Sequence, residues 1–197
     1  MRVTILDYGA GNLHSLEKAL SCAGAAVAIE PDPRLAAATD VLVLPGVGAF
    51  STAADHLAAD REYLRDAIAN GLPTLGICLG MQLLFDSSDE GPGRGLGVIP
   101  GSVEKIRASR VPHIGWNSVS PVSSRRTTAP IDTAYFANSY VCRPVDESVI
   151  VAWTSQDTDE FPAAVRVGNT LGLQYHPEKS SRPGVRVIEQ FLTEVAS

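Results

Sequence analysis

One cysteine has the local sequence of a reactive nucleophile. Cys78 stands between Gly76 and Gly80, after one short apolar run and before another. In a nucleophile elbow, a strained strand-to-helix turn exposes the nucleophile above a sheet, and glycines let the backbone turn sharply. A helix N-terminus at this point would favour the thiolate of Cys78. Because most free cysteines are buried structural residues, the motif by itself leaves both interpretations open.

A base for this nucleophile is found far along the chain, in the sequence His176-Pro177-Glu178. Pro177 favours an extended conformation at His176 and prevents a helix across the motif. Residues i and i+2 of an extended segment point to the same side, so Glu178 can hold one imidazole nitrogen while the other faces Cys78. That is the arrangement of a catalytic triad. The other histidines are not followed by a carboxylate in this way and are interpreted as structural: His14, His56 and His113.

A glycine-rich turn can supply half of an oxyanion hole. Gly46 and Gly48 follow the apolar run 40–45 and precede a predicted helix. Sites in open α/β sheets lie at the carboxyl ends of strands, and glycines let backbone N–H groups point inward. The N–H of Leu79, directly after the nucleophile, would supply the other half. The turn lacks the G-x-x-x-x-G-K-[ST] and G-x-G-x-x-G patterns of phosphate loops, and a plain tight turn stays an open alternative.

The composition is that of an ordinary globular protein. The 197 residues are 45% hydrophobic and 19% charged, and the net charge of -6 argues against nucleic acid or an anionic membrane as a partner. No apolar run approaches the ~20 residues of a membrane span, and the N-terminus resembles a first strand more than a signal peptide. Three widely spaced cysteines without a C-x-x-C pair predict neither disulfides nor a zinc site, and they fit a reducing cytoplasm. We expect no metal and no cofactor.

The elements that must position these residues alternate along the first half of the chain. Strands are predicted over 2–7, 26–30, 40–45 and 73–77, and helices over 13–24, over 52–70 and directly after Cys78. Strands that alternate with helices at these spacings predict βαβ units. We therefore expect an α/β fold with an open, mostly parallel, twisted sheet flanked by helices.

The second half of the chain is rich in strands. A long glycine-rich surface loop is predicted over 86–101, and a helix over 183–195 ends the chain. The strands predicted between them cover 102–107, 116–122, 133–142, 148–154, 162–168 and 171–175. We expect these strands to extend the same sheet and residues 118–130 to be the most mobile segment. Since no shift in composition divides the chain, residues 1–197 are expected to form a single domain.

Three motifs together resemble the class I, triad-type glutamine amidotransferases: P-G-V-G at 45–48, G-I-C-L-G-M-Q at 76–82 and H-P-E at 176–178. The resemblance covers essentially the whole chain and implies the flavodoxin-like amidotransferase fold. It implies that Cys78 attacks the side-chain amide of glutamine and forms a thioester, while His176, oriented by Glu178, moves the protons. The implied oxyanion donors are the backbone N–H groups of Val47 and Leu79. The implied substrate contacts are Gly46, Gly48, Gln82, Ser139 and Tyr140. A non-enzymatic member of the same superfold would lack the His-x-Glu pair.

Further motifs narrow the resemblance to the glutaminase subunits of imidazole glycerol phosphate synthases: D-Y-G-x-G-N at 7–12, P-G-V-G-A-F at 45–50, G-W-N at 115–117 and H-P-E-K-S at 176–180. It implies a heterodimer in which ammonia passes through a tunnel to a (β/α)8-barrel cyclase. The cyclase converts the ribulosyl intermediate PRFAR into imidazole glycerol phosphate and AICAR in histidine biosynthesis. The implied partner contacts are Asn12, Trp116, Tyr135 and Lys179. The structural alternatives are a helix cap for Asn12, a core aromatic for Trp116 and a solvated charge for Lys179. The alternative function is the glutaminase subunit of another amidotransferase, of the anthranilate or pyridoxal phosphate synthase type.

Overall fold

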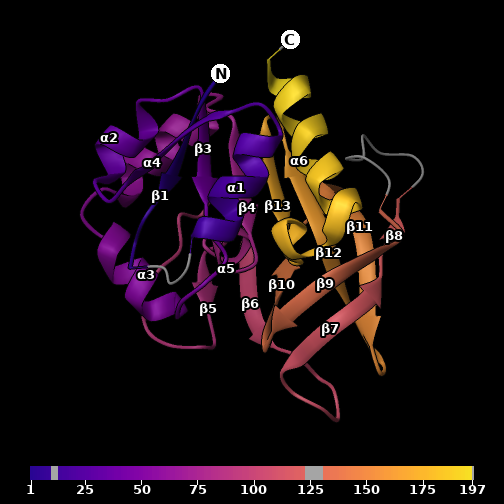
Figure 1. Ribbon diagram of the computed structural model, residues 1–197. Coiled ribbons are helices and arrows are strands. Elements are labelled where there is room, and N and C mark those ends of the chain that lie inside the picture. Colours follow the sequence, from indigo (N-terminus) through magenta and orange to yellow (C-terminus); the bar gives the residue numbers. More distant parts are fainter. Residues whose placement is uncertain (10–12, 123–130, 197) are drawn as a thin grey trace.

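The computed structural model describes residues 1–9, 13–122 and 131–196 (Figure 1). Its largest element is an eight-stranded sheet with the order β2-β1-β3-β4-β13-β12-β11-β8. The five strands from β2 to β13 pair in parallel, and the last three are antiparallel. The parallel part has the flavodoxin-like strand order, in which sites form outside the carboxyl ends of the strands. The predicted α/β class and mostly parallel sheet are confirmed.

Two smaller sheets stand beside the large one. One has the order β10-β6-β5, and the other is the antiparallel pair β7-β9. The expectation that the later predicted strands extend the main sheet is therefore wrong for β6, β7, β9 and β10. The strands are β1 Arg2–Leu6, β2 Ala26–Glu30, β3 Val41–Leu44, β4 Thr74–Ile77, β5 Ser87–Ser88, β6 Gly101–Lys105, β7 His113–Ser118, β8 Ser120–Pro121, β9 Thr133–Asn138, β10 Tyr140–Pro144, β11 Ile150–Gln156, β12 Asp159–Val167 and β13 Thr170–Leu173.

Helices cover both faces of the large sheet. The buried apolar residues of α1 and α6 pack with one set of strand residues, and those of α2 to α5 pack with the alternate set. Figure 1 shows α1 and α6 in front of the sheet, with both chain termini at the end opposite α5. The helices are α1 His14–Cys22, α2 Pro33–Ala37, α3 Phe50–Leu57, α4 Arg61–Ala69, α5 Leu79–Gln82 and α6 Ser181–Val195, with short 3-10 helices η1 Glu147–Val149 and η2 Pro177–Lys179.

The single helix predicted over 52–70 is wrong, because the structure has two helices there. α3 ends at Leu57 and α4 begins at Arg61, and between them the Asp60 carboxylate pairs with Arg34 of α2 at 2.6 Å. The apolar residues of both helices keep a helical spacing across the break, so the periodicity did not reveal it. Helix α2 itself was missed, although Asp32 and Pro33 form the usual cap and first position of a helix.

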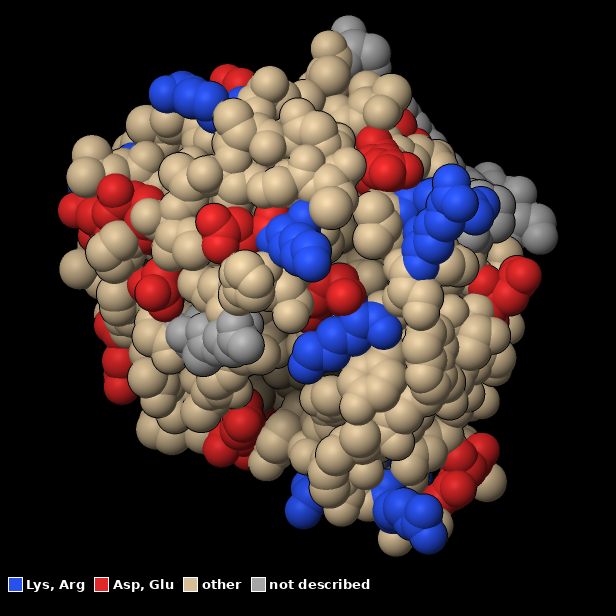
Figure 2. Space-filling model, in the orientation of Figure 1, with Lys and Arg blue, Asp and Glu red and all other residues tan. Residues whose placement is uncertain are grey.

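The segment predicted as a surface loop over 86–101 is partly buried. Leu96 and Ile99 lie in the core, and Ser87–Ser88 forms β5. Of the segment expected to be mobile, residues 120–121 form β8, while 123–130 lie outside the described residues. Within the described ranges no helix is both long and apolar enough to span a membrane. On the face in Figure 2, basic and acidic side chains are interspersed.

Candidate active site

The turn at Cys78 is a strained strand-to-helix elbow, as the sequence predicted. Cys78 lies between the end of β4 and the start of α5, with φ 47° and ψ -104°. Non-glycine residues rarely adopt positive φ, and such conformations cluster at functional sites. The flanking glycines make room for the turn. A Cβ on Gly80 would lie 1.9 Å from the Leu44 carbonyl oxygen, and a Cβ on Gly76 would lie 2.7 Å from the Gly80 oxygen.

Cys78, His176 and Glu178 lie together at the carboxyl ends of β4 and β13, two adjacent parallel strands. Nδ1 of His176 is 2.7 Å from Oε1 of Glu178, and these side chains are only 2% and 8% exposed. Burial lowers the pKa of His176, but hydrogen bonds to Cys78 and Glu178 and the charges of both groups outweigh burial and raise it from 6.5 to about 9. The raised pKa means that the protonated form of His176, an imidazolium, is favoured beside a Cys78 thiolate.

The structure corrects the reason for which His176 and Glu178 meet. His176 is extended, with φ -95° and ψ 98°, but Pro177 begins the 3-10 helix η2, which includes Glu178. The two side chains therefore meet across the start of a helical turn and not along one extended segment. Proline at the first helical position is favoured because its fixed φ suits a helix and its missing N–H is not needed there.

Three hydrogen bonds hold the backbone of His176 against β9. The His176 N–H donates to the Tyr135 carbonyl at 2.8 Å. The hydroxyl of Ser180, a buried residue, donates to the His176 carbonyl at 2.6 Å and accepts from the Tyr135 N–H at 2.9 Å. In the sequence Ser180 was noted only as part of the H-P-E-K-S motif. Its two hydrogen bonds hold the backbone of His176 against β9.

Gln174 is a site residue that the sequence analysis missed. It follows β13 and is fully buried, and its Nε2 donates to Cys78 Sγ at 3.6 Å. The thiol of Cys78 donates to the Ala137 carbonyl at 3.9 Å. No local pattern distinguishes it, because an apolar run that ends in one amide is typical of an ordinary strand.

The glycine turn after β3 reaches both reactive side chains. A Cβ on Gly46 would lie 2.8 Å from the Ile77 carbonyl oxygen, which excludes it, and it would also lie 3.0 Å from His176 Cε1 and 3.1 Å from Cys78 Cβ. Gly48 has φ 120°, which L side chains rarely adopt. Between them, the half-buried Val47 packs against the core cluster that includes Cys78. The structure thus brings this turn and the elbow together.

Two further contacts frame this turn. Leu79 is the first residue of α5, and the first N–H groups of a helix have no carbonyl partner within that helix. The buried Tyr8, just after β1, donates its hydroxyl to the Pro45 carbonyl at the start of the turn. Burial raises the pKa of the Tyr8 phenol, and the charges of Cys78 and Asp7 raise it further. Tyr8 therefore acts as a neutral hydrogen-bond donor that holds the turn.

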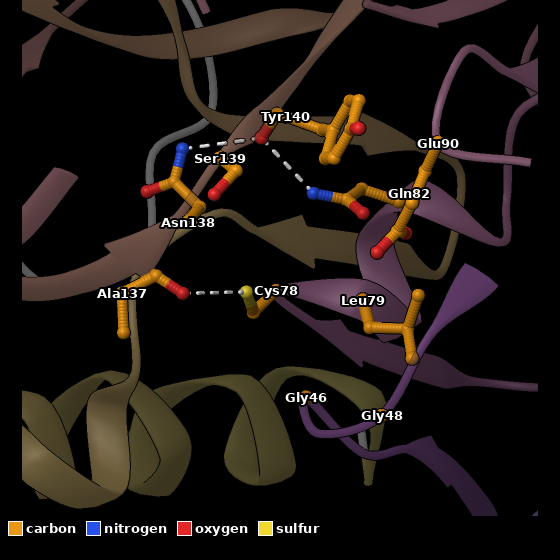
Figure 3. Close-up of a pocket in the computed structure, with 10 residues that line it drawn as sticks. All are labelled: Gly46, Gly48, Cys78, Leu79, Gln82, Glu90, Ala137, Asn138, Ser139 and Tyr140. Atoms are coloured by element: carbon orange, nitrogen blue, oxygen red, sulfur yellow. Dashed lines mark hydrogen bonds between the residues drawn. The ribbon is translucent and has the colours of Figure 1, made fainter. Parts of the chain in front are cut away.

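A pocket of about 220 Å³ lies beside Cys78. The side-chain amides of Gln82 and Asn138 both donate to the Tyr140 carbonyl at 3.1 Å. Figure 3 shows Gln82 and Glu90 to one side of Cys78 and the glycine turn to the other. The volume is below that of sites for drug-sized ligands and suits a ligand as small as an amino acid. The lining residues are Gly46, Gly48, Cys78, Leu79, Gln82, Glu90, Ala137, Asn138, Ser139 and Tyr140.

Glu90 adds a carboxylate to this pocket. Its Oε2 accepts from the Phe50 N–H at 3.0 Å, at the start of α3. The sequence analysis placed Glu90 in a surface loop, and no local pattern distinguishes it from the neighbouring acidic residues. Within the parts of the chain that the structure describes, no group of three or more His, Cys, Asp or Glu side chains is placed to hold a metal ion.

The residues expected at a partner interface differ in their exposure to solvent. Trp116 on β7 is 54% exposed and packs edge-on against Tyr135 on β9, with ring centroids 6.2 Å apart. Ile114, two residues along β7, is 64% exposed. Lys179 is exposed at the end of η2. Asn12 lies outside the described residues.

An α/β sheet with cysteine, histidine and glutamate at the ends of adjacent strands is the arrangement expected of the class I glutamine amidotransferases. The family model described as "Glutamine amidotransferase class-I" matches residues 4–195. The chain is 40% identical to "Imidazole glycerol phosphate synthase subunit HisH" of Synechocystis sp., over 98% of this chain and 97% of that protein. It is 44% identical to the protein of the same name from Sulfolobus acidocaldarius, over 99% of this chain and 97% of that protein.

Solved structures agree on the fold. A crystal structure of a glutamine amidotransferase is similar with a TM-score of 0.79 at 20% identity and covers 99% of both chains. The structure of PurLQS from Thermotoga maritima is similar with a TM-score of 0.69 at 21% identity and covers 98% of both chains. The chain belongs to the class I glutamine amidotransferases and, within them, to the family of imidazole glycerol phosphate synthase HisH subunits. The predicted family is confirmed.

Proposed function

We propose that this protein hydrolyses glutamine to glutamate and ammonia, with Cys78 as nucleophile, His176 as acid and base and Glu178 as the group that orients His176. The observation that carries the proposal is the buried hydrogen-bonded series from Glu178 through His176 to Cys78, with 2.7 Å between carboxylate and imidazole. A nucleophile, a base and an orienting group in this order are the requirement for acyl transfer.

The reaction proceeds in two stages. The Cys78 thiolate attacks the side-chain amide carbon of glutamine, and the N–H groups of Val47 and Leu79 bind the oxyanion. His176 then gives its proton to the amide nitrogen, so that ammonia leaves and a glutamyl thioester remains. In the second stage His176 takes a proton from water, the hydroxide attacks the thioester, and glutamate is released with return of the thiolate.

The pocket supports an amino-acid substrate with the side-chain amide directed at Cys78. Glu90 supplies a negative charge for the α-ammonium group. Backbone groups of Gly46, Gly48, Ser139 and Tyr140, together with the side chain of Gln82, would contact the rest of glutamine. Because the Tyr140 carbonyl already accepts two amide donors, we assign Gln82 the further task of shaping this wall.

We propose that the ammonia is passed to a cyclase subunit that makes imidazole glycerol phosphate and AICAR from PRFAR. The support is the family, whose members are named as subunits of imidazole glycerol phosphate synthase. The exposed side chains of Trp116 and Ile114, with the half-buried Tyr135 packed against Trp116, give an apolar surface suited to a protein partner. Lys179 and Asn12 are assigned to the same interface.

We further propose that residues 1–197 act as one domain in the cytoplasm. Both core clusters share the strands of one sheet, which supports a single folding unit. A cysteine that acts as a thiolate must stay reduced, and the cytoplasm keeps thiols reduced. The free thiols Cys22 and Cys142 fit the same environment.

The deciding experiment compares two cysteine variants. Glutamate release is measured for Cys78→Ala and for Cys22→Ala, each with and without the cyclase and its ribulosyl substrate. Cys22 is an exposed free cysteine at the end of α1, so its variant is the matched control and should keep full activity. Hydrolysis that survives Cys78→Ala would refute the covalent mechanism. Ammonia transfer to the anthranilate or pyridoxal phosphate synthase partner, and not to the cyclase, would refute the assigned partner.

A further inference from the structure

The Cys78 sulfur has three polar neighbours with opposite preferences. The Ala137 carbonyl, at 3.9 Å, accepts from the thiol and disfavours an anion. The His176 imidazole is hydrogen-bonded to the sulfur, and the side-chain amide of Gln174 donates to it at 3.6 Å. A protonated sulfur suits the carbonyl, whereas a thiolate suits the two donors.

The burial of Gln174 needs an explanation. Its side chain is fully buried, and its Oε1 has no hydrogen-bond partner among residues 1–9, 13–122 and 131–196. A buried amide with an unsatisfied oxygen costs free energy, which leucine or methionine in the same place would avoid. The amide N–H directed at the sulfur is the contact that an apolar side chain cannot make.

We propose that Gln174 stabilises the Cys78 thiolate with its side-chain amide; this inference rests on the proposed nucleophilic role of Cys78. An amide N–H that donates to an anion forms a charge-assisted bond, which is stronger than the same bond to a neutral thiol. The bond acts twice. It favours the thiolate before attack, and it stabilises the thiolate that leaves when water opens the thioester.

Two other titratable groups near the sulfur, Tyr8 and Cys142, do not supply this stabilisation. Burial raises the pKa of both Tyr8 and Cys142, and the Cys78 charge raises each further, so both stay neutral near pH 7. His176, backed by Glu178, is the cationic partner of the thiolate. The side-chain amide of Gln174 keeps its N–H donor at every pH. A change in the pH profile of Cys78 after Gln174 is replaced therefore reports on the sulfur and not on a titration of residue 174.

The test replaces Gln174 by methionine, which has a similar length and no donor. The rate of Cys78 alkylation by iodoacetamide, measured against pH in the full-length protein, should have its midpoint raised by about one pH unit. The kcat of glutamine hydrolysis with the cyclase bound should fall about tenfold. KM should not change, because other residues line the pocket.

A matched control separates this effect from a general loss of packing. Gln190→Met removes a half-buried amide on α6 that donates to Glu194 at 2.8 Å, and it should leave the alkylation profile unchanged. Gln174→Glu keeps the shape but places a carboxylate near the sulfur, and it should raise the alkylation midpoint further than methionine does. Folded Gln174 variants with the wild-type alkylation profile would overturn the inference.

A measurement on the unmutated protein decides the matter even where a variant does not fold. The side-chain amide protons of Gln174 should shift in NMR spectra as Cys78 ionises, and the shift should be absent after Cys78 is alkylated. Amide protons that do not respond would overturn the inference. Hydrolysis that survives Cys78→Ala would instead refute the proposed function, so the two failures are distinguishable.

Discussion

Replacing Glu178 by glutamine removes the negative charge beside His176 and keeps an oxygen that can accept from Nδ1. The pKa of His176 is raised from 6.5 to about 9 in the folded protein. An imidazole that is more basic in the folded state stabilises the fold below pH 6.5, and this contribution is lost as the pH rises through 9. At roughly 1.4 kcal/mol for each pKa unit, the full contribution is about 3 kcal/mol. Because Cys78 also raises this pKa, only part of the contribution comes from Glu178, on the order of 1 to 2 kcal/mol.

Glu178→Gln should therefore lower the free energy of unfolding by about 1.5 kcal/mol at pH 6 and by almost nothing at pH 10. Urea unfolding of both proteins at intervals between these pH values measures the difference, and ionisations common to both proteins cancel. Glu194→Gln is the control. It breaks the part-buried pair with Arg166, at 2.6 Å, and because carboxylate and guanidinium groups do not ordinarily titrate between pH 6 and pH 10, the loss should not depend on pH. A Glu178→Gln loss that stays constant from pH 6 to pH 10 would refute the reasoning.

Three further predictions concern the elbow and the partner surface. Cys78→Gly should be more stable to urea than Cys78→Ala by about 1 kcal/mol, because glycine relieves the positive φ; equal stability would contradict this strain. Gly80→Ala should lower the free energy of unfolding by more than about 3 kcal/mol, since its Cβ meets the Leu44 carbonyl; a near-normal melting temperature would contradict this clash. Trp116→Ala should weaken cyclase binding about tenfold in calorimetry; unchanged affinity would place the interface elsewhere.

The sequence was sufficient to bring the candidate catalytic residues together, because the carboxyl ends of parallel strands meet at one edge of the sheet. Residue 46 follows β3, Cys78 follows β4, and His176 comes soon after β13, and these strands are neighbours in the sheet. A correct prediction of alternating strands and helices therefore brought three distant motifs to one edge. The local backbone was less predictable, since η2 and not an extended segment presents Glu178.

What the sequence could not give depends on contacts between distant segments. At the break between α3 and α4, Asp60 forms an ion pair with Arg34 of α2. The break does not disturb the helical spacing of the apolar residues, so the sequence pattern does not reveal it. Glu90 reaches the pocket because its loop folds back over α3, and its neighbours have the same composition. Gln174 was missed because an apolar run that ends in one amide is typical of an ordinary strand. Only the structure shows that this amide is buried and cannot bond to solvent.

Strand β9 contributes to the proposed partner surface and is also hydrogen-bonded to His176, the proposed base. Tyr135 packs its ring against the exposed Trp116 and holds the backbone of His176 through its own carbonyl and N–H, the latter by way of Ser180. The Tyr135 side chain lies on the half-buried face of β9, so its ring packs against Trp116 while its backbone bonds to His176 and Ser180. A cyclase that docks on this pair would therefore press on the strand that fixes the imidazole. Partner binding and the geometry of the base would then involve one common element, because backbone hydrogen bonds connect β9 to His176.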